Sequence, residues 1–182
     1  MYSKYDITTA KWGEVKEMGH NDMAILPWGA TEPNKVHLPY CTDLLTAQAV
    51  AFEVAEKAAL QGVKLMVLPG IPLGSQNPGQ IELPYCIHTS QTTQMAVLRD
   101  IVYSLKRQGI HKMMIMSGNG GNNFKGIIRD IMIEDPDMII VQNEWFSIIP
   151  AKDFFEEKID DHAGELETSV MLHYYPELVR KD

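Results

Sequence analysis

Short apolar runs alternate along this chain with longer segments in which apolar residues recur at helical spacing. The short runs are residues 23–28, 64–68, 112–117 and 138–142. They are nearly continuous, which is typical of strands buried on both faces of a parallel sheet. The segments with helical spacing are residues 8–18, 44–61, 90–108, 123–134 and 166–175. The alternation predicts an α/β fold, with a single-domain three-layer α/β/α arrangement over residues 1–182 and a mainly parallel sheet.

Polar residues gather directly after each predicted strand. These clusters are residues 32–43, 70–84, 117–122 and 144–145, and a fifth cluster at 160–169 leads into the last helix. Open α/β sheets bind ligands at the carboxyl ends of their strands. The second cluster lies in the longest connection, residues 70–86, which should overhang that edge, and long loops of this kind are often functional. The sequence therefore predicts one site at the carboxyl edge of the sheet.

The first cluster carries two carboxylates and a histidine in a proline-stiffened loop: Glu32, His37 and Asp43. Carboxylate and imidazole side chains in one rigid loop are what a hydrolytic metal centre requires. The spacing also permits a nucleophile pair of Cys41 and His37, although no further signature accompanies it. We favour reduced, partly buried thiols for Cys41 and for Cys86, the only other cysteine.

Residues 117–122 form a glycine-rich turn that opens a helix. The backbone N–H groups of Gly118, Gly120 and Gly121 could cradle an anion or a developing oxyanion. A tight strand-to-helix turn would explain the glycines equally well, but not the three asparagines at 119, 122 and 123. The spacing is not that of a dinucleotide or phosphate loop, so a nucleotide-binding domain, suggested by topology alone, is the weakest hypothesis.

His162 lies close in sequence to four carboxylates, which would favour its charged form. A histidine that titrates near neutrality suits general acid–base catalysis. The alternative is a surface helix N-terminus at which Glu165 and Glu167 interact favourably with the helix dipole.

Composition narrows the class of protein. The chain has 182 residues, of which 45% are hydrophobic and 22% charged, as expected for one globular domain. A net charge of −8 argues against a nucleic-acid partner. The sequence has neither a long apolar run nor the apolar core of a signal peptide, so we expect a cytoplasmic protein without a membrane partner.

With these motifs in this order, the chain resembles the creatininase (creatinine amidohydrolase) family over nearly its whole length. Residues 29–39 with Asp43 look like the family's G-S-T-E-Q-H-G-P-H-L-P…T-D loop. Residues 68–69, followed by the glycine-rich loop and residues 78–79, match the second motif. Residues 117–122 look like N-G-H-G-G-N, and residues 162–169 match H-A-G-x-x-E-T-S.

The resemblance implies a creatininase-like amidohydrolase that opens a cyclic or linear amide C–N bond at a divalent-metal centre, usually Zn or Mn. It makes Glu32, Asp43 and Glu167 metal ligands, with Asp43 bridging two ions. It makes His162 the proton-transfer residue, with Glu167 as a second catalytic residue. It places Glu144 and Trp145 near a small-molecule amide substrate, together with the glycines of the 117–122 turn. It also implies a homo-oligomer, in many relatives a hexamer, and a C-terminal end longer than the one present here.

Two positions depart from the family pattern. Asn34 and Asn119 stand where relatives carry ligand histidines. An amide oxygen is a hard donor that suits Mg²⁺ or Ca²⁺ better than Zn²⁺. Weakened or Mg-like metal binding is therefore one expectation. The alternative hypothesis is a metal-deficient, non-catalytic homologue that binds a ligand or serves as a subunit.

Overall fold

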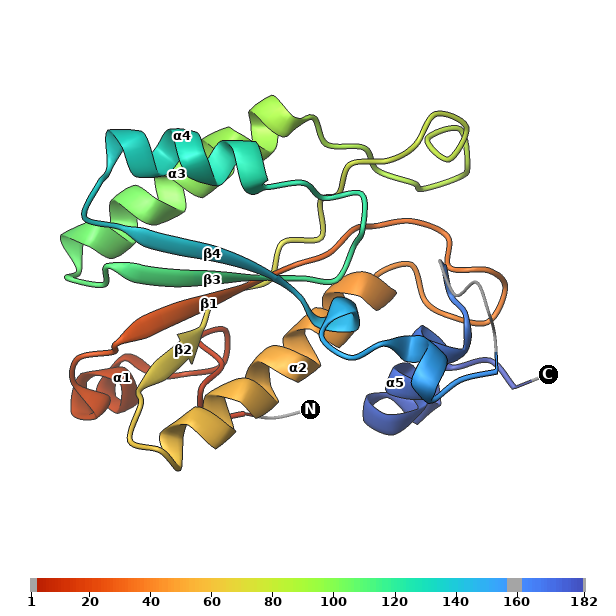
Figure 1. Cartoon of the computed structure of the whole chain (residues 1–182). Helices are drawn as coiled ribbons and strands as arrows, with labels where there is room; N and C mark the ends of the chain where they lie inside the picture. Colours follow the sequence, from red (N-terminus) through yellow and green to blue (C-terminus); the bar gives the residue numbers. More distant parts are fainter. Residues whose placement is uncertain (1–2, 157–161, 182) are drawn as a thin grey trace.

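The computed structural model describes residues 3–156 and 162–181, and these form a parallel four-stranded sheet between layers of helices (Figure 1). The strands are β1 (Met23–Trp28), β2 (Leu65–Val67), β3 (Lys112–Ser117) and β4 (Ile139–Glu144), in the order β2-β1-β3-β4. The predicted α/β class is confirmed. Because all strands are parallel, their carboxyl ends meet at one edge, as the polar clusters require.

Each face of the sheet is buried by helices because both sets of alternating strand residues are apolar. Ala24, Leu26 and Trp28 of β1 pack under α3 (Gln91–Arg107) and α4 (Lys125–Glu134), which lie above the sheet in Figure 1. Ile25 faces the other way, toward the alanine-rich side of α2 (Thr42–Ala59). Two further helices, α1 (Trp12–Met18) and α5 (Glu165–Tyr174), lie on the α2 side of the sheet (Figure 1).

Three short 3₁₀ helices complete the described secondary structure: η1 (Trp145–Ser147), η2 (Ala151–Asp153) and η3 (Pro176–Leu178). Most boundaries fall within two residues of the predicted ones. Strand β4 runs to Glu144 instead of 142 because Asn143 and Glu144 pair with β3 through their backbones, despite polar side chains. Helix α1 starts at Trp12 instead of residue 8, because the Asp6 side chain accepts bonds from Thr8 and holds a turn there.

The long loop after β2 is fastened to the carboxyl edge by polar contacts. The Trp28 indole donates to the Leu73 carbonyl oxygen at 2.7 Å, and the Thr31 hydroxyl donates to the Pro72 carbonyl oxygen at 2.7 Å. Farther along, the Ser75 N–H donates to the Asn122 side chain at 3.0 Å. The loop therefore lies against the first loop and the glycine-rich turn, as expected. Among the described residues, no helix is long and apolar enough to span a bilayer.

Candidate active site

A cavity of about 620 Å³ lies at the carboxyl edge of the sheet. Side chains from five separate stretches line it, including three carboxylates and one histidine. The predicted site residues in its wall are Glu32, Asp43, Gly118, Asn119, Gly120, Gly121, His162 and Glu167. The structure therefore brings together residues that lie up to 135 positions apart in the sequence (32 to 167).

Two glycines let Asp43, in the first turn of α2, approach the sheet. A Cβ atom on Gly118 would lie 2.0 Å from the Asp43 carbonyl oxygen, and one on Gly29 would lie 2.3 Å from the Leu44 nitrogen. These glycines are the residues directly after β3 and β1. The first turn of α2 therefore packs directly against the backbone of these two glycines, and this contact fixes the position of the Asp43 carboxylate.

Asp43 is buried, with 2% of its surface exposed, and it lies near two other acids. Burial raises the pKa of its carboxyl well above the usual range, and the charge of Glu32 raises it further. Glu167 adds a smaller effect in the same direction, while a hydrogen bond from Asn119 opposes it. Three carboxyl groups therefore lie together in the cavity, and their proximity favours the neutral form of Asp43.

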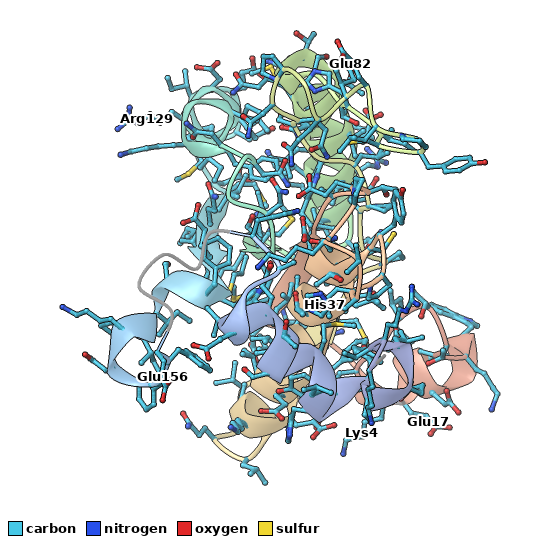
Figure 2. The ribbon with its side chains drawn as sticks, turned by 90° about the vertical axis from the view of Figure 1, so that its right-hand side faces the viewer. Lys4, Glu17, His37, Glu82, Arg129 and Glu156 are labelled. Atoms are coloured by element: carbon cyan, nitrogen blue, oxygen red, sulfur yellow. The ribbon has the colours of Figure 1, made fainter. Side chains whose placement is uncertain are left out.

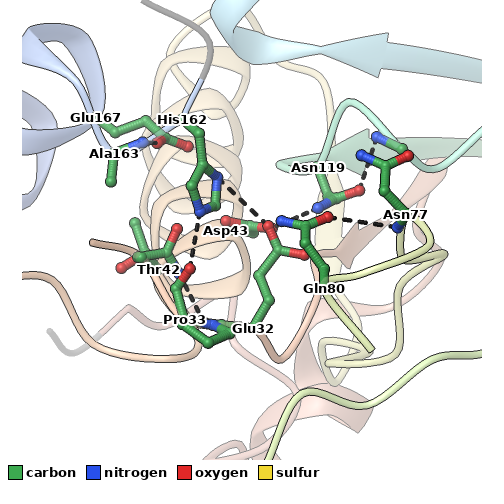
Figure 3. Close-up of polar contacts among 12 residues, drawn as sticks. Glu32, Pro33, Thr42, Asp43, Asn77, Gln80, Asn119, His162, Ala163 and Glu167 are labelled. Atoms are coloured by element: carbon green, nitrogen blue, oxygen red, sulfur yellow. Dashed lines mark hydrogen bonds and ion pairs between the residues drawn. The ribbon is translucent and has the colours of Figure 1, made fainter. Parts of the chain in front are cut away.

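Asn119 donates from Nδ2 to Asp43 Oδ2 at 2.8 Å, as Figure 3 shows. Its Oδ1 accepts from the Gly121 N–H at 2.8 Å. Asn34 is also buried, and its Nδ2 donates to the carbonyl oxygens of Glu32 at 3.1 Å and Pro39 at 3.2 Å. Asn34 Oδ1 is buried without a hydrogen-bond partner among the described residues.

His162 is held through both ring nitrogens (Figure 3). Nε2 lies 2.8 Å from the Pro33 carbonyl oxygen, and because a carbonyl only accepts, Nε2 carries a hydrogen. Nδ1 lies 3.5 Å from Glu32 Oε1. The Pro33 carbonyl oxygen thus fixes the hydrogen at Nε2, and Nδ1 faces the buried Glu32 carboxylate.

Glu167 and its neighbour Thr168 fasten α5 to the site. The Glu167 carboxylate accepts a short bond from the Ala163 N–H, next to His162. Ala163 has φ +49°, a left-handed conformation that is uncommon for a residue other than glycine. The Thr168 hydroxyl lies 2.8 Å from His37 Nε2, and Figure 2 shows His37, which belongs to the first loop, beside α5. His37 therefore connects the first loop to α5 and does not line the cavity.

Not every predicted residue reaches the cavity. Glu144 lines a separate hollow beside β4 and α4, where its carboxylate accepts from Gln142 at 3.1 Å. Trp145 packs into the core facing α2, and its neighbour Phe146 lines the cavity instead. Asp160 and Asp161, part of the predicted fifth cluster, lie outside the described residues.

The glycine-rich turn offers fewer free donors than its sequence suggests. The Gly118 N–H donates to the Trp28 carbonyl oxygen at 2.9 Å, and the Gly121 N–H is used by Asn119. An oxyanion cradle built from all three glycine N–H groups is therefore not present in this conformation. The contact of these glycines with a substrate stays a prediction.

The long loop and the later helices also contribute side chains to the wall that the sequence motifs did not indicate: Ser75, Asn77, Gln80, Phe146 and Leu166. The only signal for the first three was their place in a long loop. Figure 3 shows Asn77 and Gln80 across the cavity from His162. Phe146 and Leu166 face the cavity because of the geometry of their turn and helix, which the sequence motifs do not reveal.

The family model described as creatinine amidohydrolase matches residues 8–182. The chain belongs to the creatininase family. Over 195 aligned residues it is 27% identical to the creatinine amidohydrolase of Pseudomonas putida, covering 96% of this chain and 72% of that protein. A crystal structure of a putative creatinine amidohydrolase from Bacteroides fragilis superposes with a TM-score of 0.96 at 54% identity, covering 99% of this chain and 71% of that one.

Two further creatininase structures share the fold, a manganese form and a Zn-Zn form of a mutant creatininase. Each superposes with a TM-score of 0.81 at 24% identity. They cover 98% and 99% of this chain, and this chain covers 76% of each. Metal forms of the family thus include manganese and zinc.

The donor set of this family member does not fit such a metal pair. Within residues 3–156 and 162–181, no three His, Cys, Asp or Glu side chains are arranged to hold an ion. Zinc prefers nitrogen and sulfur ligands. The side-chain amides of Asn119 and Asn34, which replace the family's histidines, direct N–H groups instead of lone pairs toward neighbouring oxygens. The orphaned Asn34 Oδ1 is the only unpartnered amide oxygen at these two positions.

Proposed function

We propose that this chain hydrolyses the C–N bond of a small cyclic or linear amide in the carboxyl-edge cavity. The observation that carries the proposal is the position of His162, held by Pro33 and Glu32 in a cavity that also contains Asp43 and Glu167. Membership of a family named for an amidohydrolase supports the reaction class. The size and polar lining of the cavity suit a small polar molecule.

The proposed chemistry assigns one proton transfer to each of two groups. Glu167 accepts a proton from a water molecule as the water oxygen bonds to the amide carbon. His162, protonated at Nδ1, gives that proton to the leaving nitrogen as the C–N bond breaks. Glu32 stabilises the charged imidazole from 3.5 Å, and the Pro33 carbonyl oxygen holds Nε2, which leaves Nδ1 as the proton donor. The protons balance, because Glu167 gains one from water and His162 gives one to the leaving nitrogen.

The test is a panel of cyclic and linear amides, assayed for released ammonia or amine with EDTA or with added Mg²⁺, Mn²⁺ or Zn²⁺. His162→Gln should lose at least about a hundredfold of the rate, the usual contribution of a proton-transfer residue. His111→Gln is the matched control, because His111 pairs with Asp137 on an exposed surface outside the cavity. Absence of turnover for every amide under every condition would reject the proposal.

A second candidate is a homologue that binds a ligand without hydrolysing it. The paired asparagines at 34 and 119, both committed to hydrogen bonds inside the protein, favour it. In that case amides from the panel would raise the melting temperature without releasing product. Turnover that His162→Gln abolishes would exclude this candidate.

A further inference from the structure

We propose that the side-chain N–H of Asn119 takes the place of a metal cation beside the Asp43 carboxylate. As a result, the cavity binds no zinc or manganese pair tightly. The proposal concerns the same cavity as the proposed function, but it does not depend on hydrolysis. It rests on the direction in which two buried amides point. Each amide is fixed by neighbours that can only donate or only accept.

Asn119 is fixed from both ends. The Gly121 N–H can only donate, so the atom that faces it at 2.8 Å must be Oδ1, and Nδ2 then faces Asp43 Oδ2 at 2.8 Å. Turning the amide over would set two donors against each other and two oxygens against each other. Only 8% of the Asn119 surface is exposed, so either clash would be costly.

The backbone around the turn leaves little room for a different arrangement. A Cβ atom on Gly121 would lie 2.6 Å from the Ser75 carbonyl oxygen and 2.9 Å from Asn119 Oδ1. Gly121 is therefore packed between the long loop and the asparagine. Turning the Asn119 oxygen toward Asp43 would therefore break both hydrogen bonds.

Asn34 is fixed in the same way by carbonyl groups. Its Nδ2 faces the carbonyl oxygens of Glu32 and Pro39, which can only accept. The side chain is fully buried and does not line the cavity. Position 34 thus braces the first loop from within.

The donors that remain for a metal in the cavity are three carboxylates and Nδ1 of His162, which already faces Glu32 at 3.5 Å. Glu32, Asp43 and Glu167 line the cavity, but Asp43 accepts from Asn119 and Glu167 accepts from Ala163. Such a set suits a hard cation better than zinc, because asparagines stand at the two positions where the resemblance places ligand histidines. The buried carboxylate of Asp43 is stabilised by a hydrogen bond in the position where the resemblance implies a bridging metal ligand.

The experiment measures metal in the full chain directly. The protein is stripped with EDTA, dialysed separately against Zn²⁺ and Mn²⁺ and then against buffer, and analysed by mass spectrometry and calorimetry. The natural chain should retain no stoichiometric metal. The double variant Asn34→His with Asn119→His should gain affinity of roughly a hundredfold or more, since even outer contacts of a metal site change affinity by about 10- to 100-fold. Asn123→His, on the exposed side of the same turn, is the matched control and should gain nothing.

Retention of one or more zinc or manganese ions per natural chain would overturn the inference, and this measurement needs no variant to fold. Equal metal affinity of the natural chain and the folded double variant would overturn it as well. Amide turnover is assayed separately in metal-free buffer. A metal-free chain without turnover supports this inference and counts against the proposed function, so the two failures are distinguishable.

Discussion

Replacing Gly118 by alanine tests how closely α2 approaches the end of β3. The new Cβ would lie 2.0 Å from the Asp43 carbonyl oxygen, whereas ordinary contact begins at 3.4 Å, so something must move by about 1.4 Å (3.4 − 2.0). The nearest atoms are all backbone atoms of Asp43, which cannot rotate away as a flexible side chain would. Overpacking of this kind costs about 1–3 kcal/mol.

For a domain of this size, 1 kcal/mol lowers Tm by about 2–4 °C, so Gly118→Ala should melt roughly 2–12 °C below the natural chain. Differential scanning calorimetry measures this shift. A shift of Asp43 by more than about 1 Å should also reduce amide turnover, if present, by about a hundredfold.

Gly120→Ala is the matched control for this substitution. Gly120 lines the same cavity, but the atom nearest to its added Cβ is Phe146 Cζ at 4.0 Å, so its Tm should not change. Equal melting temperatures for Gly118→Ala and Gly120→Ala would refute the close approach of α2 that positions Asp43.

Three other substitutions test the core, the buried acid and the α5 contact. Phe124→Ala removes a fully buried ring 4.7 Å from Trp28, and should cost about 3–5 kcal/mol in urea unfolding; a loss below about 1 kcal/mol would contradict the packing described. Between the ordinary carboxyl pKa and the raised pKa of Asp43, the folded natural chain binds more protons than the unfolded chain, so its stability falls as pH rises. Asp43→Asn removes this loss, so the variant should become increasingly more stable than the natural chain as pH rises through this window. A difference between the two urea midpoints that stays constant or shrinks as pH rises would contradict this prediction. Thr168→Val deletes the hydroxyl partner of His37 and should cost about 0.5–1.5 kcal/mol, with Thr168→Ser as the control that retains the contact.

The sheet and the convergence of the site could be predicted because both follow from simple rules. Short, nearly continuous apolar runs such as residues 23–28 are typical of strands buried on both faces, and parallel strands place the residues after them at one edge. Asp43 and His162 were therefore expected to share a pocket, and they do. Gly62 and Gly109 follow helices and have φ of +80° and +79°, the conformation that glycine favours.

The direction of individual side chains could not be predicted in the same way. Trp145 and Phe146 are adjacent aromatic residues after β4, and only the turn geometry of η1 decides which one faces the cavity. The orientation of the Asn119 amide depends on the Gly121 N–H, a contact set by tertiary packing of the long loop. Sequence indicated that asparagine replaces histidine there, whereas the structure shows what the amide does instead.

The contacts of α5 have a consequence for the order in which the molecule is completed. All four strands lie within the first 144 residues, so the sheet can form while the last part of the chain is still being synthesised. His162 and Glu167 come later, and the Arg180 N–H must reach the His37 carbonyl oxygen before the C-terminal segment is fastened down. A nascent chain would therefore possess its sheet before the residues of α5 that complete the cavity wall are available.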